Sequence, residues 1–451
     1  MHIHVLGICG TFMAGIASIA KELGHKVTGC DQNVYPPMSI FLDSLEVEVT
    51  EGYKKDQISK KPDLFIVGNV ISRGNELMEE ILDQNLAYQS GPEWLYSNVL
   101  RNKWVIAVSG THGKTTTSSM INWILSDQNY DPGFLIGGIP GNFKTSSQLS
   151  KSDSPFFVIE ADEYDTAFFD KRSKFVHYHP KTLVINNIEF DHADIFENID
   201  QIKKHFHQLI RTIPSIGKVI ANKQDKNIET LLTQGVWSEL DFFNTIESWH
   251  HKKEDNKNHI YKQDKLLGEL KWDLMGEYNV HNALAAIAAV SHVGVSPNDA
   301  INSLKSFKNT TRRMQLIFQS EEIRIYDDFA HHPTAIKSVI EAFKQKYPEE
   351  KSLIVLDPRS NTMKRGDLKE DLKRTLEMAD AVTIFSKNLM WDITSVKTDK
   401  NNISLISDQV ENIFEFIKNN QSKFNNIIML SNGSFDGLTK KITDYFENEK
   451  K

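Results

Sequence analysis

The sequence has only two cysteines, Cys9 and Cys30, in 451 residues. They form no CxxC pair and no zinc-type spacing, which excludes a disulfide scaffold and a structural zinc site. We expect both to be reduced residues that pack in the interior. The chain also lacks any uncharged apolar stretch of about 18 residues, the length needed to span a membrane. No basic segment precedes an apolar run at the N-terminus, so export is not indicated and a cytoplasmic location is expected.

An excess of basic residues is also lacking, because the formal net charge is −8. Binding to a nucleic-acid backbone needs a basic surface, so we expect no nucleic-acid partner. Small anions remain candidate ligands, since they need only local lysines, arginines and backbone amides. Apolar residues make up 40% and charged residues 25%, which is usual for a globular protein. One hydrophobic core is insufficient at this length, and we predict several domains. No oligomeric state follows from the sequence.

Short apolar segments alternate with helical patterns along the chain, which predicts three α/β domains with parallel sheets. The predicted domains are residues 1–103, 104–307 and 308–451. The predicted strands are residues 3–8, 26–30 and 64–67 in the first domain, 104–108, 156–159, 182–185 and 218–221 in the second, and 323–326, 353–356, 381–385 and 427–430 in the third. Residues 248–264 are rich in charged and amide side chains, which predicts an exposed loop with solvated His250 and His251.

The segment SGTHGKTT at 109–116 joins a predicted strand to a predicted helix. Gly110 and Gly113 allow the backbone to approach phosphate groups, and the backbone amides at the helix start face an anion. Lys114 adds a positive charge, and the Thr115 hydroxyl is a candidate ligand of Mg²⁺. The segment is shorter than the usual G-x-x-x-x-G-K-[ST] loop, so a plain turn between strand and helix is the alternative. The strand–loop–helix context favours a phosphate-binding loop.

Acidic residues follow two predicted strands of the second domain. Glu160 comes directly after the strand at 156–159, and His192 lies in an acidic segment after the strand at 182–185. Ligands bind near the carboxyl ends of parallel strands, and Mg²⁺ takes few protein carboxylates. We therefore predict that Glu160 binds magnesium, with a solvated acidic loop as the alternative. His192 is a candidate to bind a second cation or orient water, although a histidine there is often a hydrogen-bonded structural residue.

The N-terminal glycines Gly7, Gly10 and Gly15 do not have the G-x-G-x-x-G spacing of dinucleotide-binding domains, so the signal for NAD is weak. Asp31 ends the second predicted strand, where acidic residues accept hydrogen bonds from a ribose or a base. A nucleotide with a pyrophosphate group is therefore a candidate ligand of the first helix. The alternative is a glycine turn that serves only the packing of helix on sheet.

A protein nucleophile is also lacking. The sequence has no G-x-S-x-G elbow, no cysteine beside a base and no protease-type metal tripod. The protein need not supply a nucleophile if a carboxylate of the substrate itself attacks the γ-phosphate of ATP.

Segments along nearly the whole chain resemble the Mur ligase family. They are HVLGICGTFMAGIA at 4–17, DQNVYPPMS at 31–39, GNVISRGNE at 68–76, SGTHGKTTT at 109–117, FVIEADEYDTAFFDKRSKFVHY at 157–178, NNIEFDHADIF at 186–196, GEYNVHNALAAIAA at 276–289, RRM at 312–314, YDDFAHHPTAI at 326–336, DPRSNTMK at 357–364 and SNGSFDG at 431–437. Those at 10–15, 170–178 and 358–364 resemble the branch of the family that adds a tripeptide. The sequence departs from the family pattern at Ser434 and Asp436, where more glycine is expected.

The resemblance implies an α/β fold with three domains: a Rossmann-like N-terminal domain, a central P-loop ATPase domain and a Rossmann-like C-terminal domain. ATP would be bound by Gly110, Thr111, His112, Gly113, Lys114, Thr115, Thr116, Asn279, Asn282, Arg313 and Asp328, and Mg²⁺ by Thr115, Glu160 and His192. The other substrates would contact Gly10, Thr11, Asp31, His332, Arg359, Ser360 and Asn361, and the residues that act in catalysis would be Lys114, Glu160, His192 and His331. Capping of a helix that starts at Pro333 is the alternative for the two adjacent histidines.

The implied activity is an ATP- and Mg²⁺-dependent amide ligation in cell-wall metabolism. The carboxylate of UDP-N-acetylmuramate would be activated as an acyl phosphate and joined to the tripeptide L-alanyl-γ-D-glutamyl-meso-diaminopimelate. The third domain would close over the central one at a hinge near residues 305–312 to exclude water. Two alternatives stay open: a ligase that adds L-alanine to the same sugar nucleotide, and a regulatory protein that hydrolyses ATP without a ligated product. A dehydrogenase fits less well, because the glycine spacing is wrong.

Overall fold

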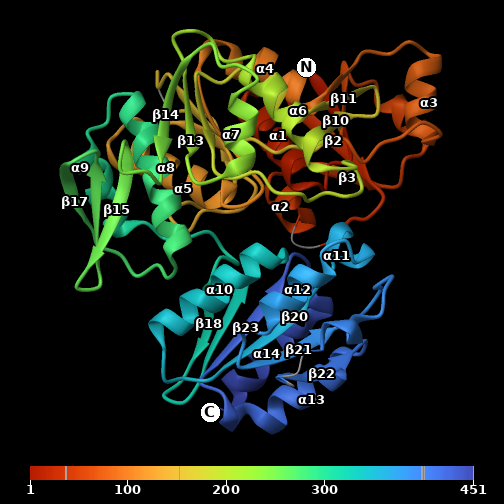
Figure 1. Cartoon of the computed structure of the whole chain (residues 1–451). Coiled ribbons are helices and arrows are strands. Elements are labelled where there is room, and N and C mark those ends of the chain that lie inside the picture. The colour runs from red at the N-terminus through yellow and green to blue at the C-terminus, as the bar shows by residue number, and fades with distance from the viewer. Residues whose placement is uncertain (36–37, 152, 398–399, 401, 450–451) are drawn as a thin grey trace. The chain divides into compact units, whose positions relative to one another are not determined.

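The computed structural model describes residues 1–35, 38–151, 153–397, 400 and 402–449, and it forms two compact units (Figure 1). Unit 1 comprises Met1–Glu189, Ile199–Trp272 and His281–Lys308, and unit 2 comprises Phe190–Asn198, Asp273–Val280 and Asn309–Lys451. Unit 1 holds the N-terminal and central sheets, and unit 2 holds the C-terminal sheet. Residues 36 and 37, within the segment at 31–39 that resembles the Mur ligases, lie outside the described residues.

The N-terminal sheet has five parallel strands in the order β3-β2-β1-β4-β5. Its strands are β1 (His2–Leu6), β2 (Lys26–Asp31), β3 (Glu48–Glu51), β4 (Leu64–Val67) and β5 (Tyr88–Ser90), and its helices are α1 (Thr11–Glu22), α2 (Met38–Ser44), α3 (Glu76–Asp83) and α4 (Gly91–Asn98). Ile3, Val5 and Leu6 of β1 are fully buried, since this central strand is covered on both faces. The three strands predicted for this domain are present, although the first ends at Leu6 rather than at residue 8.

The central sheet has ten strands in the order β17-β16-β15-β14-β13-β12-β6-β9-β7-β8. They are β6 (Trp104–Ser109), β7 (Gly133–Leu135), β8 (Ser147–Gln148), β9 (Phe156–Glu160), β12 (Thr182–Ile185), β13 (Lys218–Asn222), β14 (Glu239–Phe243), β15 (Trp249–Glu254), β16 (Lys257–Lys262) and β17 (Lys265–Leu270), with helices α5 (Lys114–Asp127), α6 (Ile199–Ile210), α7 (Lys226–Leu232), α8 (Glu277–His292) and α9 (Pro297–Ser303). Strands β9, β6, β12, β13 and β14 run parallel, so their carboxyl ends share one edge of the sheet. A small hairpin, β10 (Asp165–Ala167) and β11 (Asp170–Ser173), follows β9.

The prediction of an exposed loop at residues 248–264 is wrong. Strands β15 and β16 pair antiparallel there, with His250 opposite Tyr261. His250 is buried rather than solvated and stacks on the Tyr261 ring at 5.2 Å, while His251 is partly buried. The charged side chains of this hairpin are exposed to solvent. Because they dominate the sequence of the segment, the buried residues Trp249 and Ile260 did not indicate a strand there.

The C-terminal sheet has six strands in the order β18-β19-β23-β20-β21-β22, and only the pair β18·β19 is antiparallel. Its elements are β18 (Gln315–Gln319), β19 (Arg324–Asp328), α10 (Pro333–Lys346), β20 (Ser352–Asp357), α11 (Asn361–Arg365), α12 (Lys369–Leu376), β21 (Ala381–Phe385), β22 (Ile403–Ser407), α13 (Val410–Asn420), β23 (Asn426–Ser431) and α14 (Leu438–Glu449). Alternate residues of β20 enter different cores: Ile354 and Leu356 pack in one cluster with α10 and α12, and Leu353 and Val355 in another with α13 and α14. The sheet is therefore covered by helices on both faces, as Figure 1 shows.

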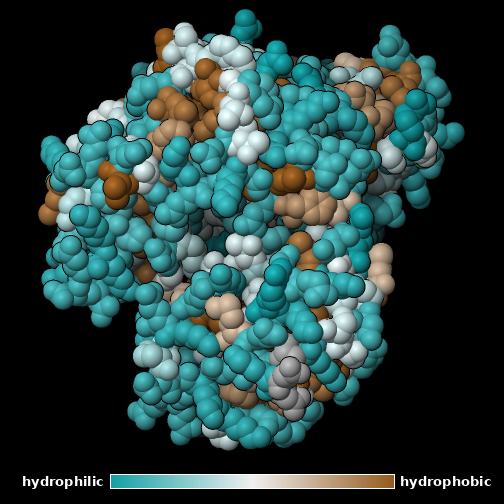
Figure 2. All heavy atoms as spheres, viewed as in Figure 1, coloured by the Kyte–Doolittle hydropathy of each residue, from teal (hydrophilic) through white to brown (hydrophobic). Residues whose placement is uncertain are grey.

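Hydrophilic side chains cover most of the face shown in Figure 2, and hydrophobic ones are scattered over it. No helix in the described part of the chain is long and apolar enough to cross a bilayer. Both cysteines are free thiols; Cys30 is buried as predicted, whereas Cys9 is only partly buried.

Candidate active site

The segment at 109–116 connects the carboxyl end of β6 to the start of α5 and needs glycine at two positions. Gly110 has φ +130° and Gly113 has φ +80°, a region that side-chain-bearing residues rarely adopt. A Cβ atom on Gly113 would lie 2.5 Å from Asn282 Oδ1, and one on Gly110 would lie 3.0 Å from the Asn187 carbonyl oxygen. The loop therefore curls tightly at the start of a helix, where free backbone amides can receive a phosphate group.

Lys114 is the first residue of α5 and is largely buried beside acidic residues. Its Nζ donates to the Gly110 carbonyl oxygen at 2.7 Å and to Glu163 Oε2 at 3.0 Å. Burial alone would lower the pKa of Lys114, but the carboxylates of Glu163, Asp162 and Glu160 outweigh it and raise the pKa above its usual value. Lys114 is therefore cationic and positioned across the mouth of the loop.

Glu160 ends β9, next to β6 in the sheet, and lies beside the first turn of α5. Its Oε1 accepts a hydrogen bond from Thr115 Oγ1 at 3.1 Å, and its Oε2 accepts one from the Gly137 amide at 2.7 Å. A hydroxyl and a carboxylate side by side are the hard oxygen donors that Mg²⁺ prefers. Thr115 and Glu160 would therefore fit a magnesium ion, and their role as its ligands stays a prediction.

The remaining residues predicted to bind ATP in unit 1 lie within this loop, except for Asn282, which lies beside it. The amide of Thr111 donates to the Asn187 carbonyl oxygen at 3.1 Å, and that of His112 donates to Asn187 Oδ1 at 2.7 Å. Asn282, on α8, accepts a hydrogen bond from Thr117 Oγ1 at 3.2 Å, and Thr116 is buried in the first turn of α5.

Three supporting residues were not predicted from the sequence: Glu163, Asn186 and Asn187. The two asparagines follow β12 and hold the phosphate loop, with Asn186 Nδ2 donating to Thr117 Oγ1 at 3.0 Å. The sequence did contain a signal for the two asparagines, because polar residues directly after a buried strand lie at the edge of the sheet where ligands bind. Glu163 could not be distinguished by sequence from its acidic neighbours.

The predicted sugar-nucleotide residues meet at the start of α1. Asp31, at the end of β2, accepts hydrogen bonds from the amides of Cys9 at 2.9 Å and Asn33 at 3.3 Å. Gly10 is the residue before α1 and Thr11 its first residue, and no side chain caps the helix there. Asp31 therefore orders the turn that leaves the N-terminal amides of α1 available.

The other predicted residues belong to unit 2, whereas the phosphate loop belongs to unit 1. That these residues act together with the loop stays a prediction. Asp191 is buried and contacts His331 Nε2 at 3.7 Å, while Thr362 Oγ1 donates to its Oδ1 at 2.8 Å. Burial would raise the pKa of Asp191, but the nearby imidazoles of His331 and His192 and the hydrogen bond from Thr362 lower it well below its usual value. His192 itself has φ +56° in the turn after Asp191.

Asp328, Arg313 and Asn279 are held by their own unit. Asp328 is buried at the end of β19 and accepts hydrogen bonds from the Met314 and Ala330 amides, both at 2.7 Å. Its pKa is raised by burial. The Arg313 guanidinium lies 5.0 Å from the Phe329 ring, and Asn279 Nδ2 donates to the Met275 carbonyl oxygen at 2.7 Å.

His332 has the structural role that the sequence offered as an alternative. It is the N-cap of α10, and its Nδ1 accepts a hydrogen bond from the Thr334 amide at 3.3 Å ahead of Pro333. Contact with substrate stays a prediction for this residue.

A charged cluster lies at the carboxyl ends of β20, β21 and β23, where parallel sheets bind ligands. Arg359 Nη1 lies 3.6 Å from Asp357 Oδ2 and 3.9 Å from Asp436 Oδ1, and Lys387 Nζ lies 2.5 Å from Asp436 Oδ2. Ser360 caps α11 through a 3.3 Å hydrogen bond from the Met363 amide, and Asn361 is the first residue of that helix. Asp436 thus occupies the expected glycine position with φ +45° and pairs with two cations.

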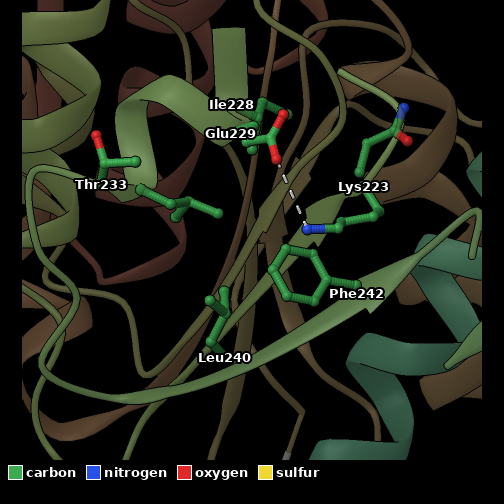
Figure 3. A pocket seen from close by; sticks show the side chains of 8 residues that line it. Lys223, Ile228, Glu229, Thr233, Leu240 and Phe242 are labelled. Atoms are coloured by element: carbon green, nitrogen blue, oxygen red, sulfur yellow. Dashed lines mark ion pairs between the residues drawn. The ribbon is translucent and has the colours of Figure 1, made fainter. Parts of the chain in front are cut away.

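A separate cavity of about 240 Å³ lies between α7 and β14 (Figure 3). Lys223 and Glu229 approach one another across it at 4.0 Å, and Leu240 and Phe242 line its side. None of the predicted site residues lines this cavity, so it is not part of the candidate active site.

Comparisons with known proteins match all three sheet-bearing parts of the chain. The Mur ligase family catalytic domain matches residues 2–102, the Mur ligase middle domain matches residues 108–290, and the Mur ligase glutamate ligase domain matches residues 312–431. The UDP-N-acetylmuramate–L-alanyl-γ-D-glutamyl-meso-2,6-diaminoheptandioate ligase of Escherichia coli is 47% identical, with 98% of each chain covered.

Two further comparisons separate branches of the family. A murein peptide ligase from Psychrobacter arcticus, known from its crystal structure, is 39% identical with a TM-score of 0.76, and 98% of each chain is covered. The UDP-N-acetylmuramate–L-alanine ligase of Clostridium acetobutylicum is 32% identical over 79% of this chain and 77% of its own. A three-domain α/β fold, a phosphate loop beside paired oxygen donors and these full-length similarities together establish that the chain belongs to the Mur ligase family.

Proposed function

We propose that this protein joins the lactyl carboxylate of UDP-N-acetylmuramate to the amino group of L-alanyl-γ-D-glutamyl-meso-diaminopimelate, with cleavage of ATP to ADP and phosphate. The observation that carries the proposal is the phosphate loop with Lys114 in place and Thr115 beside Glu160. The higher identity to ligases of the tripeptide than to those of L-alanine, 47% against 32%, supports the choice of acceptor. Recycling of cell-wall peptides in the cytoplasm is the process that corresponds to this activity.

The first chemical step is attack of the lactyl carboxylate on the γ-phosphate of ATP. Lys114 and the backbone amides at the start of α5 bind the transferring phosphoryl group and stabilise the charge that develops on its oxygens. Thr115 and Glu160 would hold Mg²⁺, which adds positive charge at the phosphates. The products of this step are an acyl phosphate and ADP.

In the second step, the tripeptide amine attacks the acyl carbon, phosphate leaves and the amide bond forms. Asp191 is buried and ionised next to His331, an arrangement that orients the imidazole. We propose that Arg359 contacts a carboxylate of the incoming peptide, because its guanidinium lies at the ligand edge of the C-terminal sheet. Water must be excluded, since it would hydrolyse the acyl phosphate.

A competition experiment tests the proposal. The purified protein is incubated with ATP, Mg²⁺ and UDP-N-acetylmuramate, with L-alanine and the tripeptide both present, and the products are weighed by mass spectrometry. We expect UDP-muramoyl-tripeptide with one ADP and one phosphate per product. The L-alanine adduct would instead assign the protein to the other branch, and ATP hydrolysis without any adduct would favour a regulatory ATPase.

A further inference from the structure

Lys174 is a buried lysine with no carboxylate at hydrogen-bond distance from its ammonium group among the described residues. It lies directly after β11, and the residue is 8% exposed. The nearest carboxylate is Asp162 Oδ2, 4.0 Å from its Nζ, and the rings of Phe12 and Tyr164 flank it at 5.3 and 5.5 Å. No residue in the described part of the chain accepts a hydrogen bond from its ammonium group, although the group is not sealed from solvent.

This arrangement favours binding of an anion. A lysine ammonium carries three N–H donors, and burial without hydrogen bonds is costly. Aromatic rings stabilise the charge but accept no conventional hydrogen bond, and an ion pair at 4.0 Å is weak. A ligand carboxylate that approaches to hydrogen-bond distance would therefore satisfy donors that the protein leaves unused.

The position of Lys174 within unit 1 indicates which anion. Phe12 is the second residue of α1, whose first turn contains the predicted sugar-nucleotide contacts. Asp162 follows Glu160 at the end of β9, in the acidic segment that also holds Lys114 through Glu163. Lys174 thus contacts one residue from the sugar-nucleotide turn and one from the segment beside the phosphate loop.

The reaction requires a cation at such a position. The lactyl carboxylate and the γ-phosphate are both anions, and they must approach to bonding distance against their mutual repulsion. Lys114 compensates the charge on the phosphate side. We propose that Lys174 binds the lactyl carboxylate of UDP-N-acetylmuramate and positions it for attack, with Phe12 and Tyr164 fixing the ammonium group. This inference rests on the proposed function.

Binding measurements with two nucleotides test the assignment. UDP-N-acetylmuramate carries the lactyl carboxylate, whereas UDP-N-acetylglucosamine carries the same diphosphate without it. We expect Lys174→Met to weaken binding of the first by about 10–100-fold, the usual value of a hydrogen bond to a charged group, and to leave the second unchanged. Lys174→Arg should retain most of the affinity. Lys171→Met is the matched control, because Lys171 is an exposed lysine of the same segment that pairs with Asp165.

Other results would overturn the proposal. Equal weakening of both nucleotides would assign Lys174 to the diphosphate, and unchanged binding would remove it from the site. In case Lys174→Met does not fold, the wild-type protein can be labelled by ¹³C-methylation of its lysines and titrated by NMR. The Lys174 signal, identified with the Lys174→Arg variant, must then shift with UDP-N-acetylmuramate and not with UDP-N-acetylglucosamine.

The two proposals fail in different ways. A wild-type protein that binds UDP-N-acetylmuramate but forms no amide would contradict the ligase function while leaving the Lys174 contact measurable. A wild-type protein that ligates, with a Lys174→Met variant that binds and turns over normally, would contradict the Lys174 proposal alone.

Discussion

At the scale of single residues, the site depends on the buried pair Lys114–Glu163. Replacing Lys114 with Met should lower kcat by about 100–1000-fold, because a charge that stabilises the transferring phosphoryl group is lost. The same change leaves the 3% exposed side chain of Glu163 without its lysine, which costs about 3–5 kcal/mol of folding stability. The double variant Lys114→Met/Glu163→Gln should recover stability in thermal unfolding but not activity in an ADP-release assay. Recovery of both would show that Lys114 acts only in folding.

A second residue-scale prediction concerns His4, a fully buried histidine of β1. Its Nδ1 lies 2.8 Å from Thr28 Oγ1 and its Nε2 3.2 Å from Gln57 Oε1, and burial lowers the pKa of His4 to about 4. The unfolded chain, with a histidine pKa near 6.5, binds more protons between these values, so the folded state loses stability as pH falls from about 6.5 to about 4. The loss should approach about 3 kcal/mol.

Urea unfolding at pH 7 and pH 5 measures this loss. His4→Gln should be less stable than wild type at pH 7 but less sensitive to the change in pH. An equal dependence on pH in both proteins would contradict the role of His4.

Sequence analysis found the residue types of the site more readily than their partners. Gly110, Gly113 and Lys114 could be predicted as phosphate contacts because their short glycine loop lies between a strand and a helix. The partner of Lys114 could not be predicted, because three carboxylates follow one strand and only the side-chain geometry selects Glu163. The ion pairs of Asp436 with Lys387 and Arg359 could not be predicted either, because these residues are distant in sequence.

At the scale of elements, two explanations for His332 at the start of α10 can be tested, namely helix capping and contact with substrate. As an N-cap, His332 should be replaceable by Asn, whereas Ala should cost about 1 kcal/mol. If His332 also contacts substrate, His332→Asn will keep its thermal stability but raise KM for one substrate. Thermal unfolding combined with steady-state kinetics separates the two effects, and unchanged kinetics in a stable Asn variant would leave capping as its whole role.

The hairpin of β15 and β16 depends on Asp241 of β14. Asp241 Oδ1 accepts a hydrogen bond from Ser248 at 2.6 Å, and its Oδ2 accepts one from the Trp249 indole at 2.9 Å. Burial would raise the pKa of Asp241, but these hydrogen bonds outweigh it and lower the pKa. We expect Asp241→Ala to speed amide hydrogen exchange in Lys257–Lys262 by about tenfold or more, as two hydrogen bonds to a charged group are lost. Exchange in β6 is the internal reference and should not change.

Strands with continuous burial were predictable, and this hairpin was not. Residues such as Val184 and Ile384 lie in apolar runs that are covered on both faces, so their strands stand out in the sequence. In β15 two neighbouring residues, Trp249 and His250, are buried, His251 is partly buried and the three after it are exposed, so no period of two appears.

At the scale of the whole molecule, the three predicted α/β sheets are present, and the family architecture is confirmed. The proposed boundaries at 103/104 and 307/308 stay predictions. The change from unit 1 to unit 2 after Lys308 falls within the predicted hinge at 305–312.

Closure at this hinge predicts a more compact protein when both nucleotides bind. Small-angle X-ray scattering should show a smaller radius of gyration with a non-hydrolysable ATP analogue, Mg²⁺ and UDP-N-acetylmuramate than without them. The Lys114→Met variant should compact less. An unchanged radius in the wild-type protein would argue against domain closure.

The assignment of Phe190–Asn198 to unit 2 has a consequence for synthesis of the chain. Thr362, which donates a hydrogen bond to Asp191, is made 171 residues later. At about 5–20 residues per second, roughly 9–34 s separate the two residues on the ribosome. The segment Phe190–Asn198 after β12 therefore remains without its final partners during this time, although the strands around it are already able to pair. Its three acidic residues, Asp191, Asp194 and Glu197, keep this segment hydrated and lower its tendency to aggregate during translation.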